Sequence, residues 1–337
     1  MAGAPAPLAV SLGDPAGVGP ELIVTAWSRR IEVELPPFVV VGGARSLAAA
    51  AANRGLALPI AAVGSPAEAT DIFGTALPVL AGTDAVCEPG SPTVTGARLA
   101  LASLDRAVAL ARSGEARALV TMPVAKAELA KVGFAHPGQT EFVAVSCGVR
   151  PEDAVMMLAG PSLRAVPLTV HCALSEVPGM LSSAMIVSKG RIVAAALRDD
   201  FGIARPRLAV CGLNPHAGEQ GRIGREDAEI IAPAVAALAA EGIDATGPHP
   251  ADALFAPRAR TGYDVALAMY HDQALIPVKA LDFDEGVNVT LGLPIVRTSP
   301  DHGTAFAIAG KGIADAGATI AAIRMAADCA ARRARNG

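Results

Sequence analysis

The stretch "PLAVSLGDPAGVGPELIVTAWSRR" (residues 7–30) combines an apolar run, a glycine-rich turn and an amphipathic segment. The apolar run is typical of a buried strand, and residues 19–30 have the pattern of a helix that begins near Pro20, because proline suits a first helical turn. A strand, a tight turn and a helix in this order form the unit from which parallel α/β sheets are built.

The turn itself, "GDPAGVGPE" (13–21), contains three glycines that permit a close backbone approach. A helix N-terminus of this kind can receive an anion. The spacing is not GxGxxG, so the usual dinucleotide fingerprint is absent. On spacing alone, a plain strand-to-helix turn and a binding loop remain equally good interpretations.

The same alternation continues along the 337 residues, a length that favours two compact units. Continuous apolar strands separated by helices predict parallel sheets covered by helices on both faces. The expected strands lie in 36–43, 116–124, 163–171, 205–216 and 264–271, and the expected helices in 95–114, 180–202 and 224–242.

The composition is that of a globular protein, with 52% hydrophobic and 18% charged residues. A net charge of −4 offers no basic surface for a phosphate backbone, so we expect no nucleic-acid partner. The N-terminus lacks a signal-peptide pattern and no apolar run reaches the length of a membrane span. Scattered cysteines without CxxC pairs fit free thiols in a reducing cytoplasm; they are Cys87, Cys147, Cys172, Cys211 and Cys329.

Three of the six histidines share one context, the end of an apolar run: His171 ends "AVPLTVH", His216 ends "LAVCGLNPH" and His271 ends "DVALAMYH". Taken singly, each is more often a surface or hydrogen-bonded histidine. Residues just past the carboxyl ends of parallel strands converge, however, and three imidazoles there suit a divalent metal with an open position. The repeated context therefore favours a metal site.

Polar residues also interrupt the apolar C-terminal region. Lys279 and Arg297 are suited to clamp a phosphate or carboxylate, and Asn288 lies between them. A second glycine-rich loop, "DHGTAFAIAGKGIAD" (301–315), leads into the last helix. Each charge alone is more often a solvated surface group.

Long ordered motifs resemble the 4-hydroxythreonine-4-phosphate dehydrogenases of vitamin B6 synthesis, from residue 13 to about residue 315. The motifs are "GDPAGVGPE", "MPVAKAELAKVGFAHPGQTEFVA", "GLNPHAGEQGRIGRED", "GPHPADALF", "AMYHDQALIPVK" and "GVNVTLGLPIVRTSPDHGTAFAIAG". The first is also similar to the GDGIGPE turn of isocitrate and isopropylmalate dehydrogenases. The resemblance implies their fold, two α/β/α domains with an interdomain cleft: residues 1–125 plus 270–337 on the nucleotide side, and 126–269 on the substrate, metal and dimer side.

The resemblance also implies roles for single residues. His171, His216 and His271 would bind one divalent metal (Zn, Mg or Co), in a homodimer that shares the metal site across its interface. NAD or NADP would lie against the second glycine-rich loop, at Gly303, Thr304 and Gly310. Asp252 and Asp272 are candidates for a proton acceptor or for orienting a ligand histidine, with Asp272 favoured for the second role because it adjoins His271. The substrate contacts map onto Gln139, Thr140, Lys279, Asn288 and Arg297.

The implied reaction is NAD(P)-dependent oxidation of 4-phosphooxy-L-threonine, followed by loss of CO2, in pyridoxal phosphate biosynthesis. Two positions depart from the family pattern. Gln139 stands where GHTE has a histidine, and glutamine cannot carry a proton near neutral pH. Ala307 stands where the nucleotide loop often has an acidic side chain, which weakens the expected nucleotide contact there.

Three other functions compete with this interpretation. A sister decarboxylating dehydrogenase would act on another phosphorylated sugar acid or an aromatic cis-dihydrodiol, and Gln139 leaves room for it. A metal-dependent hydrolase would use the three histidines to activate water, but it needs neither a phosphate clamp nor the glycine-rich loop at 303–312. A non-catalytic metal-binding protein would need still fewer of these polar residues.

Overall fold

The computed structural model describes residues 5–336. Contacts divide the chain into two compact units, unit 1 with residues 1–151 and 293–331, and unit 2 with residues 152–292 and 332–337. These boundaries differ from the expected ones. Residues 126–151 belong to unit 1 because their first helix packs on a long helix there, and residues 270–292 belong to unit 2 because their strand pairs with a strand of that unit.

Unit 1 is built on parallel strands in the order β3-β4-β2-β1-β5-β12. The first strand, "LAVS", and the second, "FVVV", are buried along their whole length, as expected for a sheet covered on both faces. This confirms the α/β class. The strands are β1 (Leu8–Ser11), β2 (Phe38–Val41), β3 (Ile60–Val63), β4 (Leu77–Leu80), β5 (Leu119–Thr121) and β12 (Arg297–Pro300).

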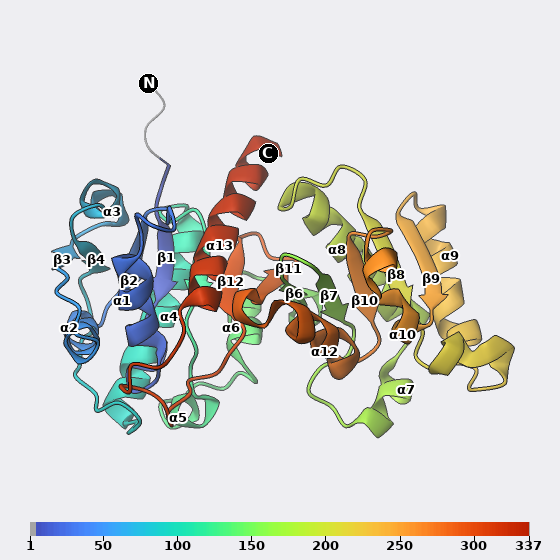
Figure 1. The fold of residues 1–337 in the computed structure, drawn as a ribbon, viewed down its shortest axis with the longest axis horizontal. Coiled ribbons are helices and arrows are strands. Elements are labelled where there is room, and N and C mark those ends of the chain that lie inside the picture. Colours follow the sequence, from blue (N-terminus) through green and yellow to red (C-terminus); the bar gives the residue numbers. More distant parts are fainter. Residues whose placement is uncertain (1–4, 337) are drawn as a thin grey trace. The chain divides into compact units, whose positions relative to one another are not determined.

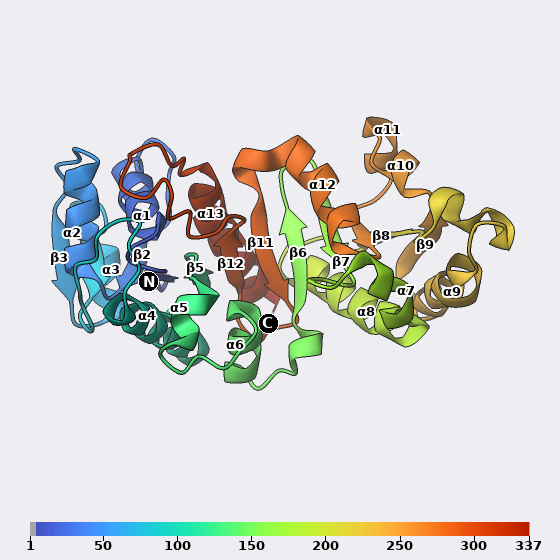
Figure 2. The same ribbon diagram turned by 90° about the horizontal axis from the view of Figure 1, so that it is seen from below.

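Helices cover both faces of this sheet, with α1 and α13 on one side and α4 on the other (Figure 2). Thr93 caps the start of α4, where its hydroxyl accepts a hydrogen bond from the amide of Gly96, and Gly114 follows the last residue in the left-handed conformation. The helices are α1 (Gly19–Ser28), α2 (Ala44–Asn53), α3 (Pro66–Ile72), α4 (Val94–Ser113), α5 (Lys126–Ala130), α6 (Gln139–Ser146) and α13 (Gly317–Asn336).

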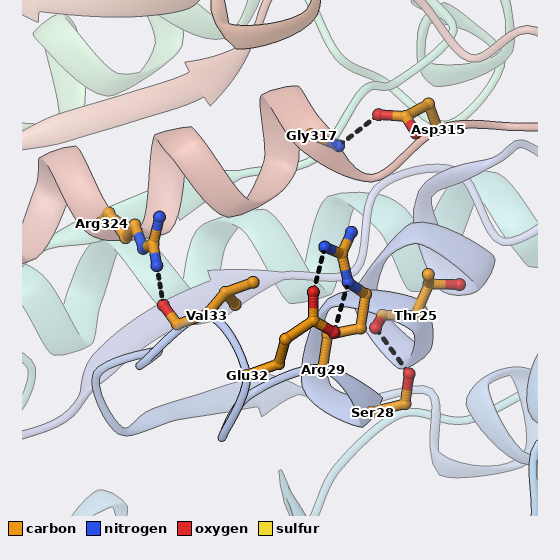
Figure 3. Close-up of polar contacts among 8 residues, drawn as sticks. All are labelled: Thr25, Ser28, Arg29, Glu32, Val33, Asp315, Gly317 and Arg324. Carbon is orange, nitrogen blue, oxygen red and sulfur yellow. Dashed lines mark hydrogen bonds and ion pairs between the residues drawn. The ribbon is translucent and has the colours of Figure 1, made fainter.

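Polar contacts at the surface of unit 1 include one that joins α13 to the turn after α1 (Figure 3). Asp315 accepts a hydrogen bond of 2.7 Å from the amide of Gly317 at the start of α13, and Arg324 of the same helix donates to the carbonyl of Val33. Beyond the end of α1, Arg29 and Glu32 form an ion pair of 2.7 Å. Such exposed pairs contribute little stability, so packing holds the unit together.

The glycine-rich turn after β1 is required for close packing of the chain on itself. Gly13 has φ +74°, and a Cβ at Gly17 would lie 2.8 Å from the carbonyl oxygen of Thr304. The amide of Val18 donates to that same carbonyl at 3.0 Å. This turn and the second glycine-rich loop therefore lie directly against each other.

Unit 2 has strand order β11-β6-β7-β10-β8-β9, which can be followed from left to right in Figure 1. The expected all-parallel sheet is wrong here, because β6 is antiparallel to both β7 and β11. The four-residue turn 160–163 joins β6 to β7 directly, and so short a connection permits an antiparallel pair alone. The strands are β6 (Val155–Ala159), β7 (Arg164–Pro167), β8 (Arg207–Cys211), β9 (Asp244–His249), β10 (Val265–Ala268) and β11 (Val287–Leu291).

In unit 2, α12 lies on one face of the sheet and α8 and α9 on the other (Figure 2). The helix expected over 224–242 is divided: a π-helical turn, Asp227–Ile231, precedes α9. Pro233 at the start of α9 lacks the amide that would bond to Glu229, and a wider turn accommodates this loss. The α-helices are α7 (Val177–Met180), α8 (Ser183–Asp199), α9 (Ala232–Ala240), α10 (Ala251–Leu254), α11 (Pro257–Arg260) and α12 (His271–Asp282), and the short 3-10 turns are Pro151–Asp153, Leu174–Glu176, Pro215–Gly221 and Phe283–Glu285.

The structure also bears on the cysteines and on membrane spans. All five cysteines are free thiols, and burial raises the pKa of Cys211 to about 12.

Within residues 5–336, no single helix has the length and apolarity needed to cross a membrane. The bent pair Leu174–Met180 and Ser183–Asp199 meets those criteria only when its two helices are taken together.

Candidate functional site

Three neighbouring strands of unit 2 carry the predicted metal ligands. β10 pairs in parallel with β7 on one side and with β8 on the other. His171 follows β7, His271 begins α12 just after β10, and His216 follows β8. The carboxyl ends of parallel strands lie at the same end of a sheet. These three residues, termed the histidine cluster, therefore all lie just beyond the carboxyl end of the parallel strands of unit 2.

Two members of the histidine cluster are close neighbours. The ring centroids of His171 and His271 lie 5.9 Å apart. Nδ1 of His271 lies 2.8 Å from Oδ1 of Asp272, which leaves Nε2 as the ring atom available to a ligand. Among residues 5–336, no three His, Cys, Asp or Glu side chains already converge as an ion-binding group. The imidazole pair and its carboxylate neighbour are nevertheless the donor chemistry that suits a divalent cation.

The backbone is unusual at two of the three histidines. His171 has φ 51° and His216 has φ 53°, in the left-handed region that residues other than glycine rarely adopt. From His216 the left-handed conformation continues through Gln220. Such conformations persist only where surrounding contacts hold them, and they gather at functional sites.

The buried carboxylate of Asp227 provides one of those contacts. It accepts hydrogen bonds from the amides of Leu213 and Asn214, at 2.8 and 3.2 Å, and from the side chain of Asn214 at 2.8 Å. It therefore fixes the chain just before His216. Asp227 was not among the expected site residues, because its position at the start of a helical segment carries no signal of this role.

Lys189 supports the loop of His171 in a similar way. Its Nζ donates to the carbonyl of Leu168, just after β7, at 2.6 Å. Burial lowers the pKa of this lysine. A half-buried lysine in the middle of α8 is visible in the sequence only as one charge in an apolar helix, so its partner was not predictable.

In unit 1, the expected substrate residues Arg297 and Thr140 form a group with Thr121, which was not expected there; the three residues are termed the arginine cluster. Arg297 is only 3% exposed. Its Nε and Nη2 donate to Oγ1 of Thr121 at 3.1 and 2.7 Å, and its Nη1 donates to Oγ1 of Thr140 at 3.3 Å. Burial lowers the pKa of Arg297 to about 10, with the nearby charge of Glu141 opposing the shift, so the guanidinium remains charged at neutral pH.

Gln139 is the first residue of α6 and directly precedes Thr140 of the arginine cluster. Its Nε2 donates to the carbonyl of Met122 at 3.3 Å. Its Oε1 is buried and has no hydrogen-bond partner among the described residues. An unsatisfied buried acceptor is costly, so this oxygen is suited to accept a hydrogen bond from a ligand.

The remaining substrate and catalytic candidates lie in unit 2. Lys279 is half-buried on α12, and Asn288 lies on β11 with its buried Oδ1 unpartnered within the described chain. Asp252 is exposed on α10. The expected substrate contacts are thus divided between the units, with Gln139, Thr140 and Arg297 in unit 1 and Lys279 and Asn288 in unit 2.

The expected nucleotide loop makes several contacts with its own unit. A Cβ at Gly310 would lie 2.6 Å from Cβ of Pro89, and the amide of Gly310 donates to Glu21 at 3.2 Å. The carbonyl of Thr304 is bonded to the turn after β1, whereas Gly303 borders open space. Burial raises the pKa of Glu21 in the first turn of α1. The side chain of Glu21 thus joins the start of α1 to the second glycine-rich loop.

The chain is similar to known proteins over most of its length. The family model described as "Pyridoxal phosphate biosynthetic protein PdxA" matches residues 34–326. The chain is 65% identical over 329 residues to a 4-hydroxythreonine-4-phosphate dehydrogenase of Erythrobacter litoralis, covering 97% of this chain and 98% of that protein.

Solved structures of 4-hydroxythreonine-4-phosphate dehydrogenases are also similar to this chain. A 4-hydroxythreonine-4-phosphate dehydrogenase from Klebsiella pneumoniae is similar with a TM-score of 0.86 and 36% identity, covering 98% of this chain and 99% of that one. A terephthalate 1,2-cis-dihydrodiol dehydrogenase from Burkholderia xenovorans is similar with a TM-score of 0.65 and 31% identity, covering 96% of this chain and 98% of that one. The length and identity of these matches confirm the resemblance found in the sequence motifs: the chain belongs to the PdxA family of pyridoxal phosphate biosynthetic proteins.

Proposed function

We propose that this chain is an NAD(P)-dependent and divalent-metal-dependent 4-hydroxythreonine-4-phosphate dehydrogenase. It oxidises 4-phosphooxy-L-threonine to 2-amino-3-oxo-4-phosphooxybutanoate, which loses CO2 to give 3-amino-2-oxopropyl phosphate. The observation that carries the proposal is the histidine cluster, whose members follow the carboxyl ends of three adjacent parallel strands. The activity named for relatives up to 65% identical supports it.

His171, His216 and His271 would hold the cation, which is Zn, Mg or Co. A bound cation supplies Lewis acidity toward the substrate hydroxyl, and the nicotinamide supplies the hydride acceptor. Asp272 holds Nδ1 of His271, so Nε2 would be the ring atom that binds the cation. Asp252 is exposed on α10 and is the candidate acceptor for the hydroxyl proton.

The chain's polar residues would fix the charged and polar ends of the substrate. Arg297 presents a buried, positively charged guanidinium whose orientation Thr121 and Thr140 set. In unit 2, Lys279 adds a cationic group and Asn288 an amide. Gln139 offers the acceptor Oε1 to a substrate hydroxyl or ammonium group, and its amide does not titrate.

The remaining parts of the proposal concern the cofactor and the assembly. NAD or NADP would contact Gly303, Thr304 and Gly310, of which Gly303 is the most open position. The protein would act in the cytoplasm as a homodimer that shares its metal site across the interface. A sister decarboxylating dehydrogenase remains the second candidate, since the dihydrodiol dehydrogenase of Burkholderia xenovorans has a similar structure.

The test is steady-state formation of NAD(P)H with a panel of phosphorylated hydroxy acids and one aromatic cis-dihydrodiol, with and without added divalent cation. We expect 4-phosphooxy-L-threonine to give the highest kcat/KM, and chelation to abolish turnover. A higher kcat/KM for another member of the panel would replace the substrate assignment. Full activity after chelation would show that the reaction does not require a metal.

A further inference from the structure

The loops that carry the histidine cluster are hydrogen-bonded to one another. After β7, the amide of Leu168 donates to the carbonyl of Ala268 at 2.8 Å, and Oγ1 of Thr169 donates to the carbonyl of Met269 at 2.8 Å. Backbone and side-chain bonds thus join the loop of His171 to the loop of His271.

Gln273 joins the loop of His271 to that of His216. Its Oε1 accepts a hydrogen bond from the amide of Met269 at 2.6 Å. Its Nε2 donates to the carbonyl of Gly212 at 2.8 Å. Met269 precedes His271, and Gly212 follows β8 on the way to His216, so one side chain spans two neighbouring strand ends.

The chemistry of this link requires glutamine. A planar amide carries an acceptor and a donor on one head, whereas a carboxylate only accepts and a thioether does neither effectively. Met269 is fully buried and Gly212 is buried as well. If Gln273 were lost, bulk water could not replace it as the partner of the Met269 amide and the Gly212 carbonyl without a cost in free energy.

A simple helix cap does not account for both bonds. Gln273 is the third residue of α12, and a polar side chain there commonly bonds back to an amide before the helix. That role needs only Oε1. The bond from Nε2 leaves α12 altogether and ends on the strand-end loop of β8.

We propose that Gln273 is a positioning residue that holds the loops of His271 and His216 at a fixed spacing, and so presents each histidine to a divalent cation, without binding a cation itself. The part that concerns the cation rests on the proposed function. The part that concerns the two loops rests on the hydrogen bonds alone, so the two can be tested separately.

The experiment compares Gln273→Met, which removes both bonds, with Gln273→Glu, which keeps the helix cap and loses the donor to Gly212. Tyr263→Phe is the matched control, because it deletes a buried side-chain bond of 3.1 Å to the carbonyl of Leu254 elsewhere in unit 2. Hydrogen–deuterium exchange of the cation-free protein reports on the loops. Calorimetric titration with Zn²⁺ or Co²⁺ and the visible spectrum of the Co²⁺ form report on the site.

We expect faster exchange over residues 212–217 in both Gln273 variants, with residues 269–271 affected mainly in Gln273→Met. Cation affinity should fall roughly 10- to 100-fold, the range typical when a residue that orients metal ligands is lost. Unchanged exchange over residues 212–217, or wild-type affinity in both variants, would overturn the proposal. If the wild type binds no cation while the variants still loosen the loops, the link between the loops stands and the proposed metal-dependent function fails.

Discussion

The arginine cluster and the histidine cluster differ in how the chain holds them. Arg297 is 3% exposed and its guanidinium is already bonded to two threonine hydroxyls. His171 and His216 are exposed and have left-handed backbone, and the contacts that hold them go to main-chain groups of their loops. The first cluster is thus held by side-chain hydrogen bonds before any ligand binds, whereas the second is held through the main chain of its loops. Substitutions should therefore damage binding in the first and metal-dependent turnover in the second.

The largest expected effect comes from the histidine cluster. Replacing His171, His216 or His271 by alanine should remove a cation ligand and reduce turnover by several orders of magnitude, with loss of bound metal. Metal content and kcat measured on the same preparation check this. His136→Gln is the control, because that ring packs against Phe134 and Phe142 of unit 1. Full activity of any alanine variant would exclude that histidine from the site.

Arg297→Lys should have the next largest effect. A lysine cannot reproduce the three bonds to Thr121 and Thr140, and it offers a substrate anion only a point charge. Substrate binding should weaken by roughly 1–3 kcal/mol, measured as a rise in KM while bound metal stays constant. Arg45→Lys is the matched control at an exposed arginine of the same unit. An unchanged KM and kcat would show that Arg297 does not touch the substrate.

A smaller effect is expected at Gln139. Gln139→Leu removes the unpartnered Oε1 and should raise KM. Gln139→His should retain substantial activity and add a pH-dependent limb between about pH 6 and 7, because an unperturbed imidazole has a pKa near 6.5. The pH profiles of kcat/KM for the three proteins decide the matter. Superimposable profiles of equal height would place residue 139 outside the substrate site.

The smallest effect belongs to the opposite end of β10, where Asp264 pairs with Arg207 at 3.0 Å. Burial tends to raise the pKa of Asp264, but the hydrogen bonds and charge of Arg207 outweigh it, and the pKa lies below its ordinary value of 3.8. The pair therefore stabilises the fold above that value, and its contribution is lost as the pH falls through the lowered pKa.

Asp264→Asn should accordingly reduce the free energy of unfolding by no more than about 1 kcal/mol at neutral pH, since solvent reaches the pair through the 43% exposed side chain of Arg207. Urea unfolding at pH 7 and near pH 3 measures this difference, which should shrink at the lower pH. KM and metal content should not change. A changed KM would mean that the amino end of β10 also serves the reaction.

Much of this arrangement was predictable from sequence, because apolar runs and their polar ends are local patterns. The expected strands at 163–171, 205–216 and 264–271 contain β7, β8 and β10, and parallel pairing then brings their histidines to one edge. The antiparallel β6 was missed, since its direction depends on a four-residue turn rather than on hydrophobic pattern.

Other features depend on tertiary contacts that no local pattern contains. Thr121 lies in an expected strand, yet its bonds to Arg297 join residues far apart in sequence. Gln273 stands beside His271 in "YHDQ", but its link to Gly212 requires β8 and β10 to be neighbours. The left-handed backbone of His171 and His216 has no signature in side-chain type, because histidine does not require it.

The close approach of Gly17 to Thr304 has a consequence for the order in which the chain folds as it is synthesised. Unit 1 needs β12, which pairs with β5, and the loop at Thr304, which closes on the turn after β1. Both emerge from the ribosome only after nearly all of unit 2, which is almost continuous in sequence. We therefore expect unit 2 to be the first to become resistant to protease on a nascent chain, while the earlier-made β1 waits for its last partners.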